Sequence, residues 1–371
     1  MDEPVDVRYT DSPPRKLRGI WQLSRQVSAR HGVSVFKQYA EVTALFLHRG
    51  IGPLTYYEHA LWRPEFTPEE KRRWLTSLEF EQRVKGLNPP GFQCVSSHKV
   101  IEAALLRQAC IPTPEYLGFL HPVDGLDASG QPLGDIDALQ ALLQRLAPLR
   151  VCFKLVTGQQ GQGFVATEVL WDGDAGVARS LVDGSTEPLA QFLMREVSPS
   201  IAQGYILQRV VEQHPRLREI NPTSVNTVRI WVLQTESGPE VRGAVFRMGR
   251  MGQLTDNTAR GGFFAPVALD SGCLGLAGTG SILPDTFSVH PDSGVQIEGF
   301  ELPFWQECLA LAQATLRALP QLRFTGLDLA IGKDGPIVIE TNEFPNRISV
   351  RNFGLPMGDI IDPDFPFSPP A

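Results

Sequence analysis

Near the end of the chain, two apolar runs flank Lys333-Asp334-Gly335 and predict a β-hairpin. A three-residue loop with Gly in its last position suits the left-handed conformation that such hairpins need. With this loop, Gly332 would pair with Pro336. Counting back along both strands then places Asp328 opposite Glu340. The hairpin therefore predicts two facing carboxylates inside otherwise apolar strands.

Asn342 follows Glu340 by two residues, so both side chains point to the same face of the strand. Two carboxylates and an amide oxygen would thus converge, and like charges held together there need a cation. Oxygen ligands without His or Cys suit a hard ion, Mg²⁺ or Mn²⁺, which proteins usually share with phosphates. We predict Asp328, Glu340 and Asn342 as metal ligands. The alternative is a hairpin with polar residues on a solvated face.

The composition limits the partners of this chain. Its 371 residues allow a large core and more than one domain. The net charge of −7 argues against nucleic acid as the main partner, because a phosphate-binding surface needs clustered Lys and Arg. No apolar run reaches membrane-spanning length, and no signal peptide is visible. Five scattered cysteines without CxxC spacing predict reduced thiols in a cytoplasmic protein, without a zinc site.

The first quarter of the chain predicts helices. Three segments carry apolar residues at helical spacing: 17–30, 34–48 and 53–62. Thr67-Pro-Glu-Glu70 combines a Thr N-cap, Pro at the first position and Glu three residues after the cap, and predicts a helix that runs to about Lys85. Four aromatic residues of this region are either core residues or a surface for a substrate or partner: Tyr56, Tyr57, Trp62 and Trp74.

A glycine-rich segment joins two predicted strands in the middle of the chain. Val151–Val156 and Phe164–Leu170 have apolar and β-branched residues, and Thr157-Gly-Gln-Gln-Gly-Gln-Gly163 lies between them. A P-loop or a dinucleotide-binding fold would need a helix after the glycines, so both are excluded. Such a loop can lay backbone N–H groups over phosphates as a mobile flap. A flexible surface turn is the alternative.

Two arginines lie inside apolar strands further along the chain. Arg229 alternates with Val228 and Ile230, and Arg247 belongs to a strand predicted over 241–248. An Arg in such a strand must meet an anion or remain at an edge. The polar loop 256–264 has paired glycines that suit close backbone approach to a ligand, and a plain turn is the alternative.

The order of these motifs resembles the ATP-grasp superfamily over about residues 96–350. The resemblance rests on a Lys that opens a helix (Lys99), a strand Lys before the flap (Lys154), a hinge strand (Leu207–Val211), an Asn-x-x-Arg strand (Asn226, Arg229), an Asn-x-x-Arg-Gly-Gly loop (Asn257–Gly262) and the Asp…Glu-x-Asn metal set. The phrase Gln213-His-Pro followed by Ser224-Val-Asn-Thr-Val-Arg229 looks closest to the sugar-transfer-associated branch, which is related to glutamate ligases.

This resemblance implies an α+β protein with the ATP-grasp fold, in which two α+β lobes clasp ATP. We expect a helical N-terminal domain (1–95), a small lobe with the flap (96–208), a large lobe with the metal site (209–355) and an extended C-terminal tail (356–371). Many family members begin with a Rossmann-like domain, whereas this chain begins with helices. The resemblance therefore gives little help with the substrate.

The resemblance also implies roles for residues. The expected ATP-binding residues are Lys99, Lys154, Gly158, Gly161, Gly163, Gln208, Val211 and, as a weaker candidate, Glu212. The residues expected to hold the carboxylate or the migrating phosphoryl group are Arg229, Arg247, Asn257 and Arg260. The implied reaction is ATP-dependent ligation of a small-molecule carboxylate to an amine through an acyl phosphate. A phosphotransferase, an ester-forming ligase and a non-catalytic ATP-binding regulatory protein are the alternatives, and a homodimer stays open.

Overall fold

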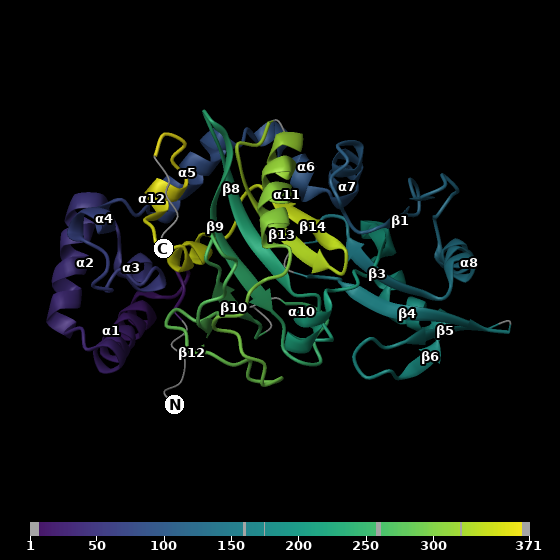
Figure 1. Ribbon diagram of the computed structural model, residues 1–371, viewed down its shortest axis with the longest axis horizontal. Coiled ribbons are helices and arrows are strands. Elements are labelled where there is room, and N and C mark those ends of the chain that lie inside the picture. The colour runs from purple at the N-terminus through teal and green to yellow at the C-terminus, as the bar shows by residue number, and fades with distance from the viewer. Residues whose placement is uncertain (1–6, 159–160, 174, 257–260, 320, 366–371) are drawn as a thin grey trace.

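The computed structural model describes residues 7–158, 161–173, 175–256, 261–319 and 321–365. The molecule is elongated, with the N-terminal helices at one end, a large sheet in the middle and a smaller lobe at the other end (Figure 1). No helix within these described ranges is long and apolar enough to cross a membrane.

The N-terminal region is helical, as predicted. Its helices are α1 (Pro13–His31), α2 (Val35–Arg49), α3 (Pro53–Glu58), α4 (Pro68–Arg72) and α5 (Ser77–Leu87). The single helix predicted from Thr67 to about Lys85 is wrong, because a second capping box, between Thr76 and Glu79, starts a new helix. Between the two helices, Trp74 turns into the core with no exposed surface.

The aromatic residues of this region are core residues. Tyr56, Tyr57 and Trp74 are fully buried and Trp62 is nearly so, which rules out the partner surface considered for these four. They belong to one hydrophobic cluster with Trp231 and Phe324 of the large sheet. The helices therefore complete the core of the large sheet, and the boundary at residue 95 stays a prediction about folding units.

The small lobe is a seven-stranded sheet in the order β2-β1-β7-β3-β4-β5-β6, with neighbouring strands antiparallel. Its strands are β1 (Tyr116–Leu120), β2 (Leu126–Asp127), β3 (Leu149–Leu155), β4 (Val165–Asp172), β5 (Ala175–Arg179), β6 (Thr186–Pro188) and β7 (Tyr205–Arg209). The helices α8 (Ile136–Leu146) and α9 (Leu189–Glu196) pack on one face around Phe153 and Leu207. The other face is left for the site described below.

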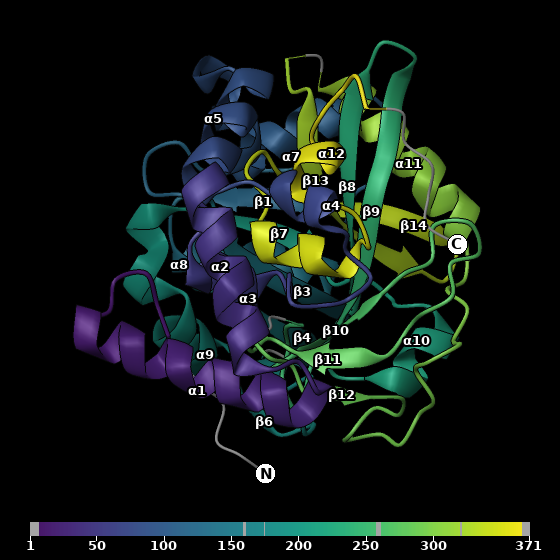
Figure 2. The ribbon, with the colours of Figure 1, turned by 90° about the vertical axis from the view of Figure 1, so that its left-hand side faces the viewer.

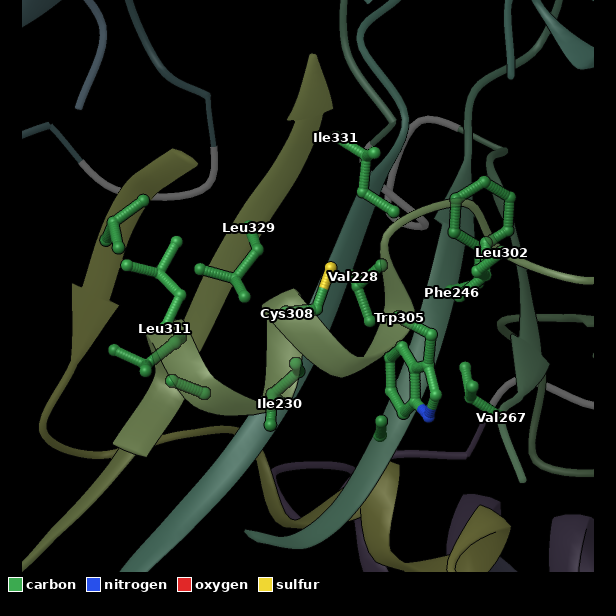
Figure 3. Packing of buried hydrophobic residues seen from close by; sticks show 14 of the residues in the cluster. Val228, Ile230, Phe246, Val267, Leu302, Trp305, Cys308, Leu311, Leu329 and Ile331 are labelled. Atoms are coloured by element: carbon green, nitrogen blue, oxygen red, sulfur yellow. The ribbon is translucent and has the colours of Figure 1, made fainter. Parts of the chain in front are cut away.

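The large lobe is a second antiparallel sheet, in the order β12-β11-β10-β9-β8-β13-β14. Its strands are β8 (Thr227–Thr235), β9 (Gly238–Met248), β10 (Phe263–Pro266), β11 (Ala277–Thr279), β12 (Thr286–Phe287), β13 (Phe324–Gly332) and β14 (Gly335–Asn342). The helix α11 (Trp305–Ala318) covers one face, and Figure 3 shows Trp305, Cys308 and Leu311 against Ile230 and Leu329.

Shorter elements connect these layers. They are η1 (Pro90–Phe92), α6 (Cys94–Ser97), α7 (Lys99–Gln108), η2 (Ser198–Gln203), α10 (Pro215–Ile220), η4 (Arg347–Asn352) and α12 (Met357–Ile360). Within the tail expected to be extended (356–371), Met357–Ile360 form α12, and Met357, Ile360 and Ile361 are buried in the N-terminal cluster. Burial of these apolar side chains outweighs the local Pro and Asp content that suggested an extended tail.

Strand alternation in the large sheet separates a core face from a site face. Val228 and Ile230 of β8 pack under α11, whereas Trp231 points to the opposite side, against the N-terminal helices. Arg229 shares the side of Trp231, two residues along the same strand. The N-terminal helices cover the Trp231 end of this face, so the Arg229 end faces the small lobe.

The hairpin of β13 and β14 has the predicted pairing of Asp328 with Glu340, reached by a different route. Its loop has two residues, because Gly332 pairs with Gly335 and not with Pro336. The register then shifts by one residue at a bulge in β14. Glu340 pairs with Asp328 and Val338 pairs with Leu329, so Ile339 has no partner on β13. The shorter loop and the bulge cancel, so the two carboxylates still face each other.

Candidate active site

A cavity of about 1090 Å³ lies between the lobes and is lined by strands of both sheets. The small lobe contributes β3 and the flap, and the large lobe contributes β8, β9, β13 and β14. Cationic and acidic side chains both line it, among them Lys99, Lys154, Arg229, Arg247, Asp256, Asp328 and Glu340. A cavity of this size with converging charged groups is the usual form of a substrate site.

On the small-lobe side, strand alternation presents Lys154 and Gln208 to this region. Phe153 is fully buried in the lobe's own core, so its neighbour Lys154 points the other way, into the cavity. Gln208 of β7 pairs with Cys152 of β3, two residues before Lys154. Gln208 and Lys154 together line a small pocket. Lys154 has no ion pair within the described part of the chain, so its charge is directed at the cavity.

Lys99 joins three parts of the site. It is the first residue of α7, and its Nζ lies 3.1 Å from Oε1 of Glu340. The same Nζ donates a 2.7 Å hydrogen bond to the carbonyl oxygen of Gly158, at the start of the flap. Lys99 therefore links the helix, the flap and the strand that carries the predicted metal ligands.

The arginines of β8 and β9 converge on Asp328. Arg229 makes a bidentate pair with Asp328, with Nε–Oδ1 and Nη2–Oδ2 distances of 2.6 Å each. Arg247 donates to Asp328 Oδ2 at 3.0 Å and to Asp256 Oδ1 at 3.0 Å. Burial alone would raise the pKa of Asp328, but the two guanidinium groups outweigh it and hold that pKa below its ordinary value. Asp328 is therefore an anion at neutral pH.

Asp256 anchors the outer end of this network and was not singled out by the sequence analysis. Its carboxylate accepts a hydrogen bond from the backbone N–H of Thr227 and one from the Thr227 hydroxyl. Burial raises the pKa of Asp256, and Arg247 opposes that rise. No sequence pattern distinguished Asp256 from an ordinary loop residue, because its partners lie 9 and 29 positions away.

Glu102 is a second functional candidate that the sequence analysis missed. Its side chain is buried beside Glu340, and its carboxylate accepts the backbone N–H of Thr341. Burial, and after it the nearby charge of Glu340, raises the pKa of Glu102 to about 8. The spacing of three residues from Lys99 places both side chains on one helix face, and this was the available signal.

We expect the free energy of unfolding of the parent to fall between about pH 5 and pH 8, and we expect this fall to be absent in Glu102→Gln. The folded protein keeps a proton on Glu102 that the unfolded chain releases near pH 4.5. The stabilisation is therefore complete below that pH and is lost as the pH rises through the folded pKa of about 8, by about 1.4 kcal/mol per pH unit at most. Urea unfolding in EDTA at several pH values measures this, and equal pH slopes for parent and variant would contradict it.

The flap lies between β3 and β4, and Gly158, Gly161 and Gly163 lie in its described part. Gly161 and Gly163 have φ angles of 73° and 62°, in the left-handed region. A side chain at Gly163 would also collide with Leu155, since a Cβ there would lie 2.5 Å from Cδ1 of that residue. A Cβ at Gly161 would lie 3.8 Å from Cγ2 of Thr255, so the flap reaches the large lobe.

The remaining predicted residues are placed as follows. Val211 lines the cavity. Glu212 does not belong to its lining, and its exposed carboxylate pairs with Lys333 at 3.3 Å. Asn257 and Arg260 lie outside the described residues.

The oxygen atoms of the hairpin fit a hard divalent cation. Arg229 and Arg247 occupy three acceptor positions of Asp328, which leaves Oδ1 able to accept once more. At Glu340, the contact with Lys99 is made by Oε1, 3.1 Å from Nζ. The Asn342 amide nitrogen donates to Gly326 O at 3.2 Å, so its amide oxygen is left as an acceptor. No group of three His, Cys, Asp or Glu in the described ranges could hold a metal alone. This incomplete set suits Mg²⁺, which keeps water or phosphate ligands.

Arg351 of η4 adds a charge that the sequence analysis did not consider. Arg351 lines the cavity, and its guanidinium donates to the carbonyls of Ser281 and Ile282 at 2.9 and 3.2 Å. It lies over the ring of Phe264, 5.1 Å from the centroid. Burial lowers the pKa of Arg351 to about 10, and no carboxylate in the described part of the chain pairs with it. Its charge therefore favours an anionic group in the cavity.

Comparison with solved structures gives distant relatives. The ATP-grasp ligase PsnB complexed with minimal precursor has 15% identity over 70% of this chain and 56% of its own, with a TM-score of 0.34. Biotin carboxylase from Campylobacter jejuni has 12% identity over 82% and 54%, with a TM-score of 0.44. D-alanyl-alanine synthetase A from Vibrio cholerae has 9% identity over 74% and 65%, with a TM-score of 0.43. The chain spans a little over half the length of the first two, and no curated protein matches the sequence.

A comparison with protein families, in contrast to these distant structures, assigns the chain to a family. The family described as sugar-transfer associated ATP-grasp matches residues 79–355, which is more than half of the chain. The match confirms the resemblance inferred from the motifs and, with the two antiparallel sheets, the α+β ATP-grasp fold. The chain belongs to the sugar-transfer associated ATP-grasp family.

Proposed function

We propose that the protein is an ATP-dependent carboxylate–amine ligase that forms an amide bond through an acyl phosphate and releases ADP and phosphate. One observation carries the proposal. Lys154 of the small lobe and Lys99 of α7, which contacts Glu340, line the same cavity as the Arg229–Asp328–Arg247 network. This arrangement offers separate positive groups for a triphosphate and for a carboxylate beside a set of oxygen ligands for Mg²⁺.

The nucleotide is proposed to bind along the small-lobe side. Lys99 and Lys154 would hold phosphate oxygens as point charges, and Lys99 would exchange its contact with Glu340 for one with phosphate. Backbone N–H groups of the flap would cover the phosphates and exclude water from the reacting atoms. Gln208 and the backbone of Val211 would contact the adenine. Glu212 is the weakest assignment, because it points away from the lining.

Asp328, Glu340 and Asn342 would hold Mg²⁺ or Mn²⁺, which neutralises charge on a transferring phosphoryl group. Arg229 and Arg247 keep Asp328 ionised and orient its carboxylate. In the same network, Arg247 has a second carboxylate partner in Asp256, so its position is fixed from two sides. With Arg260 and Asn257, these arginines are the candidates to hold the acid substrate or the migrating phosphoryl group.

The proposed chemistry has two steps. A carboxylate oxygen of the acid attacks the γ-phosphorus of ATP, the bond from phosphorus to the bridging oxygen breaks, and ADP leaves. The amine nitrogen then attacks the carbonyl carbon of the acyl phosphate. Phosphate leaves with the original carboxylate oxygen, and the amine loses a proton as the amide forms. Phosphate is a good leaving group at neutral pH, whereas the oxygen of a free carboxylate is not. This chemistry needs no side-chain nucleophile, so the cysteines have no role in it.

We expect Lys154→Ala to weaken ATP binding by about tenfold or more while leaving the fold intact. Lys154 has no ion pair to lose in the described part of the chain, and its neighbour Phe153 supplies the packing of the strand. Loss of a point charge on phosphate then acts on binding alone. Calorimetry with Mg²⁺ measures the affinity, with Lys85→Ala on the exposed side of α5 as the control. ATP affinity equal to that of the parent would remove Lys154 from the site.

A screen of ADP release over small acids and amines, with mass spectrometry of products, tests the proposal. A ligase releases ADP only when an acid and an amine are both present, and the product mass equals their sum less one water. ADP release with a phosphorylated product and no need for amine would establish a phosphotransferase instead. ATP binding without ADP release for any pair would support a regulatory protein.

A further inference from the structure

The outermost helices of the molecule carry large apolar side chains in solvent. Phe36 is 91% exposed, Leu47 75%, Leu17 69% and Trp21 51%. All four come from α1 and α2, which lie together at the end of the molecule in Figure 1 and face the viewer in Figure 2. Single exposed apolar residues are ordinary, but a group of large ones on two packed helices marks an interaction surface.

Four of the exposed residues of α2 form a stripe along the helix. Phe36, Ala40, Thr43 and Leu47 follow the spacing i, i+4, i+7, i+11, which keeps them on one side of a helix. The core side of the same helix is given by Gln38 and Leu45, which are buried. The helix α2 therefore buries one side in the molecule and carries the apolar side chains of Phe36 and Leu47 in solvent on another.

The neighbouring helix α1 concentrates positive charge in a chain whose net charge is −7. It carries five cationic residues and no Asp or Glu: Arg15, Lys16, Arg18, Arg25 and Arg30. Arg15 and Arg30 have carboxylate partners, Asp11 and Asp285. The other three have none in the part of the chain that the structure describes.

The charges and the apolar side chains of α1 share one side of the helix. Leu17, Arg18, Trp21 and Arg25 are all exposed and follow helical spacing. The Arg25 guanidinium lies over the Trp21 ring, 5.0 Å from its centroid. The one carboxylate of α2, Glu41, is already paired with Lys71 at 3.0 Å. Within α1 and α2, as the structure describes them, no unpaired carboxylate opposes an anionic partner.

We propose that α1 and α2 form a docking surface for an anionic membrane interface, with Leu17, Trp21, Phe36 and Leu47 inserted among the lipids. We call these four residues with Arg18 and Arg25 the α1–α2 surface. Basic residues that flank Trp, Phe and Leu on a helix face are the composition of interfacial helices, which lie in the headgroup region. The proposal stands apart from the ligase proposal, because none of these residues lines the cavity.

Shape favours a lipid surface over an acidic protein. The side chains project from helices at the end of the molecule, and Phe36 keeps almost none of its surface against its own chain. A projecting ring gains most in a medium that closes around it, whereas a protein partner must offer a preformed pocket for each such side chain. A second copy of this chain would bring the same positive charges against each other.

Vesicle sedimentation of the full chain tests the surface directly. We expect binding to vesicles that contain about one-third phosphatidylglycerol, on the order of tenfold weaker binding to pure phosphatidylcholine, and loss of binding as salt is raised. Quenching of tryptophan fluorescence by brominated lipid should report Trp21 in the anionic vesicles. Equal binding to both vesicle types, or binding to neither, would overturn the proposal.

Matched variants separate the surface from general effects. Phe36→Ser with Leu47→Ser, and Arg18→Glu with Arg25→Glu, should each lower vesicle binding about tenfold or more. Val123→Ser, at a residue 83% exposed elsewhere, and Arg317→Glu with Arg323→Glu, which changes net charge equally, should bind as the parent does. Melting curves confirm that all four fold. Equal losses in the control variants would overturn the proposal.

Self-association is the remaining alternative and is measured in the same series. Analytical ultracentrifugation without lipid should give a monomer for the parent and for the Phe36→Ser, Leu47→Ser variant. A parent dimer that this variant converts to a monomer would assign the surface to contact between copies and overturn the membrane proposal.

Discussion

Glu340→Gln is expected to lower the rate of ADP release by at least about a hundredfold with little change in folding stability. Glu340 faces Asp328 across the hairpin, contacts Lys99 at 3.1 Å and lies next to the buried Glu102. Gln preserves the shape and volume of the side chain. It removes the negative charge that would hold a divalent cation as charge develops on the transferring phosphoryl group.

Folding stability should change little although activity falls. The charge of Glu340 helps to raise the pKa of Glu102, so the two groups repel when both are ionised. Loss of one charge relieves that repulsion and offsets the lost contact with Lys99. The test combines a melting curve with an ADP-release assay, and Glu307→Gln, on an exposed part of α11, is the control. Turnover near the parental rate would make the hairpin a scaffold and remove the ligase proposal.

Asp328→Ala is expected to lower the free energy of unfolding by about 3–5 kcal/mol, in contrast to Glu340→Gln. Asp328 is 5% exposed and accepts three hydrogen bonds from Arg229 and Arg247. Removal of the carboxylate leaves two largely buried guanidinium groups with one fewer counter-charge. Among the residues that the structure describes, Arg247 retains the carboxylate of Asp256 as a partner and Arg229 retains none.

Urea unfolding of single and double variants measures this dependence. In an Arg229→Met background, the loss of Asp328 should cost less than it does alone, because one of the two guanidinium groups is already absent. Arg209→Met on the exposed end of β7 is the control background, since its partner Glu115 is exposed too. Equal costs of Asp328→Ala in all backgrounds would show that the pair contributes no coupling energy.

The hairpin illustrates how far periodicity alone can reach. The residues that face each other were predicted because the side-chain period of two fixes which positions share a face. The loop length was wrong by one residue, and the bulge at Ile339 compensated for it. Bulges depend on the neighbouring chain, and here Val338 donates to Pro112 O outside the sheet. No local pattern in the sequence specifies that contact.

Other parts of the site depended on contacts between distant residues. Arg229 was predicted either to meet an anion or to remain at an edge, and the anion that it meets, Asp328, is 99 positions away. Glu102 resembled any acid in the first turn of a helix, where acids are favourable. Only packing of α7 against β14 buries it and raises its pKa. The sequence predicted the fold and several of the charged residues that line the cavity, whereas their partners and their burial required the structure.

The same limit applies to the N-terminal helices. Helical spacing marked Leu17, Phe36 and Leu47 as apolar positions of helices without distinguishing the core side from the solvent side. Trp74 and the second capping box at Thr76 lay within one predicted helix, although Trp74 follows the end of α4 and enters the core. Burial in the folded protein distinguishes the core side from the solvent side, because each local pattern is equally compatible with both arrangements.

The most direct test of the ligase proposal follows oxygen atoms. With the acid and amine found by the ADP-release screen, the carboxylate is labelled with ¹⁸O, and the released phosphate is analysed by mass spectrometry. An acyl phosphate predicts one ¹⁸O atom in inorganic phosphate for each amide formed. Product formation with unlabelled phosphate, or phosphate that stays on the product, would contradict activation of the carboxylate and with it the central proposal.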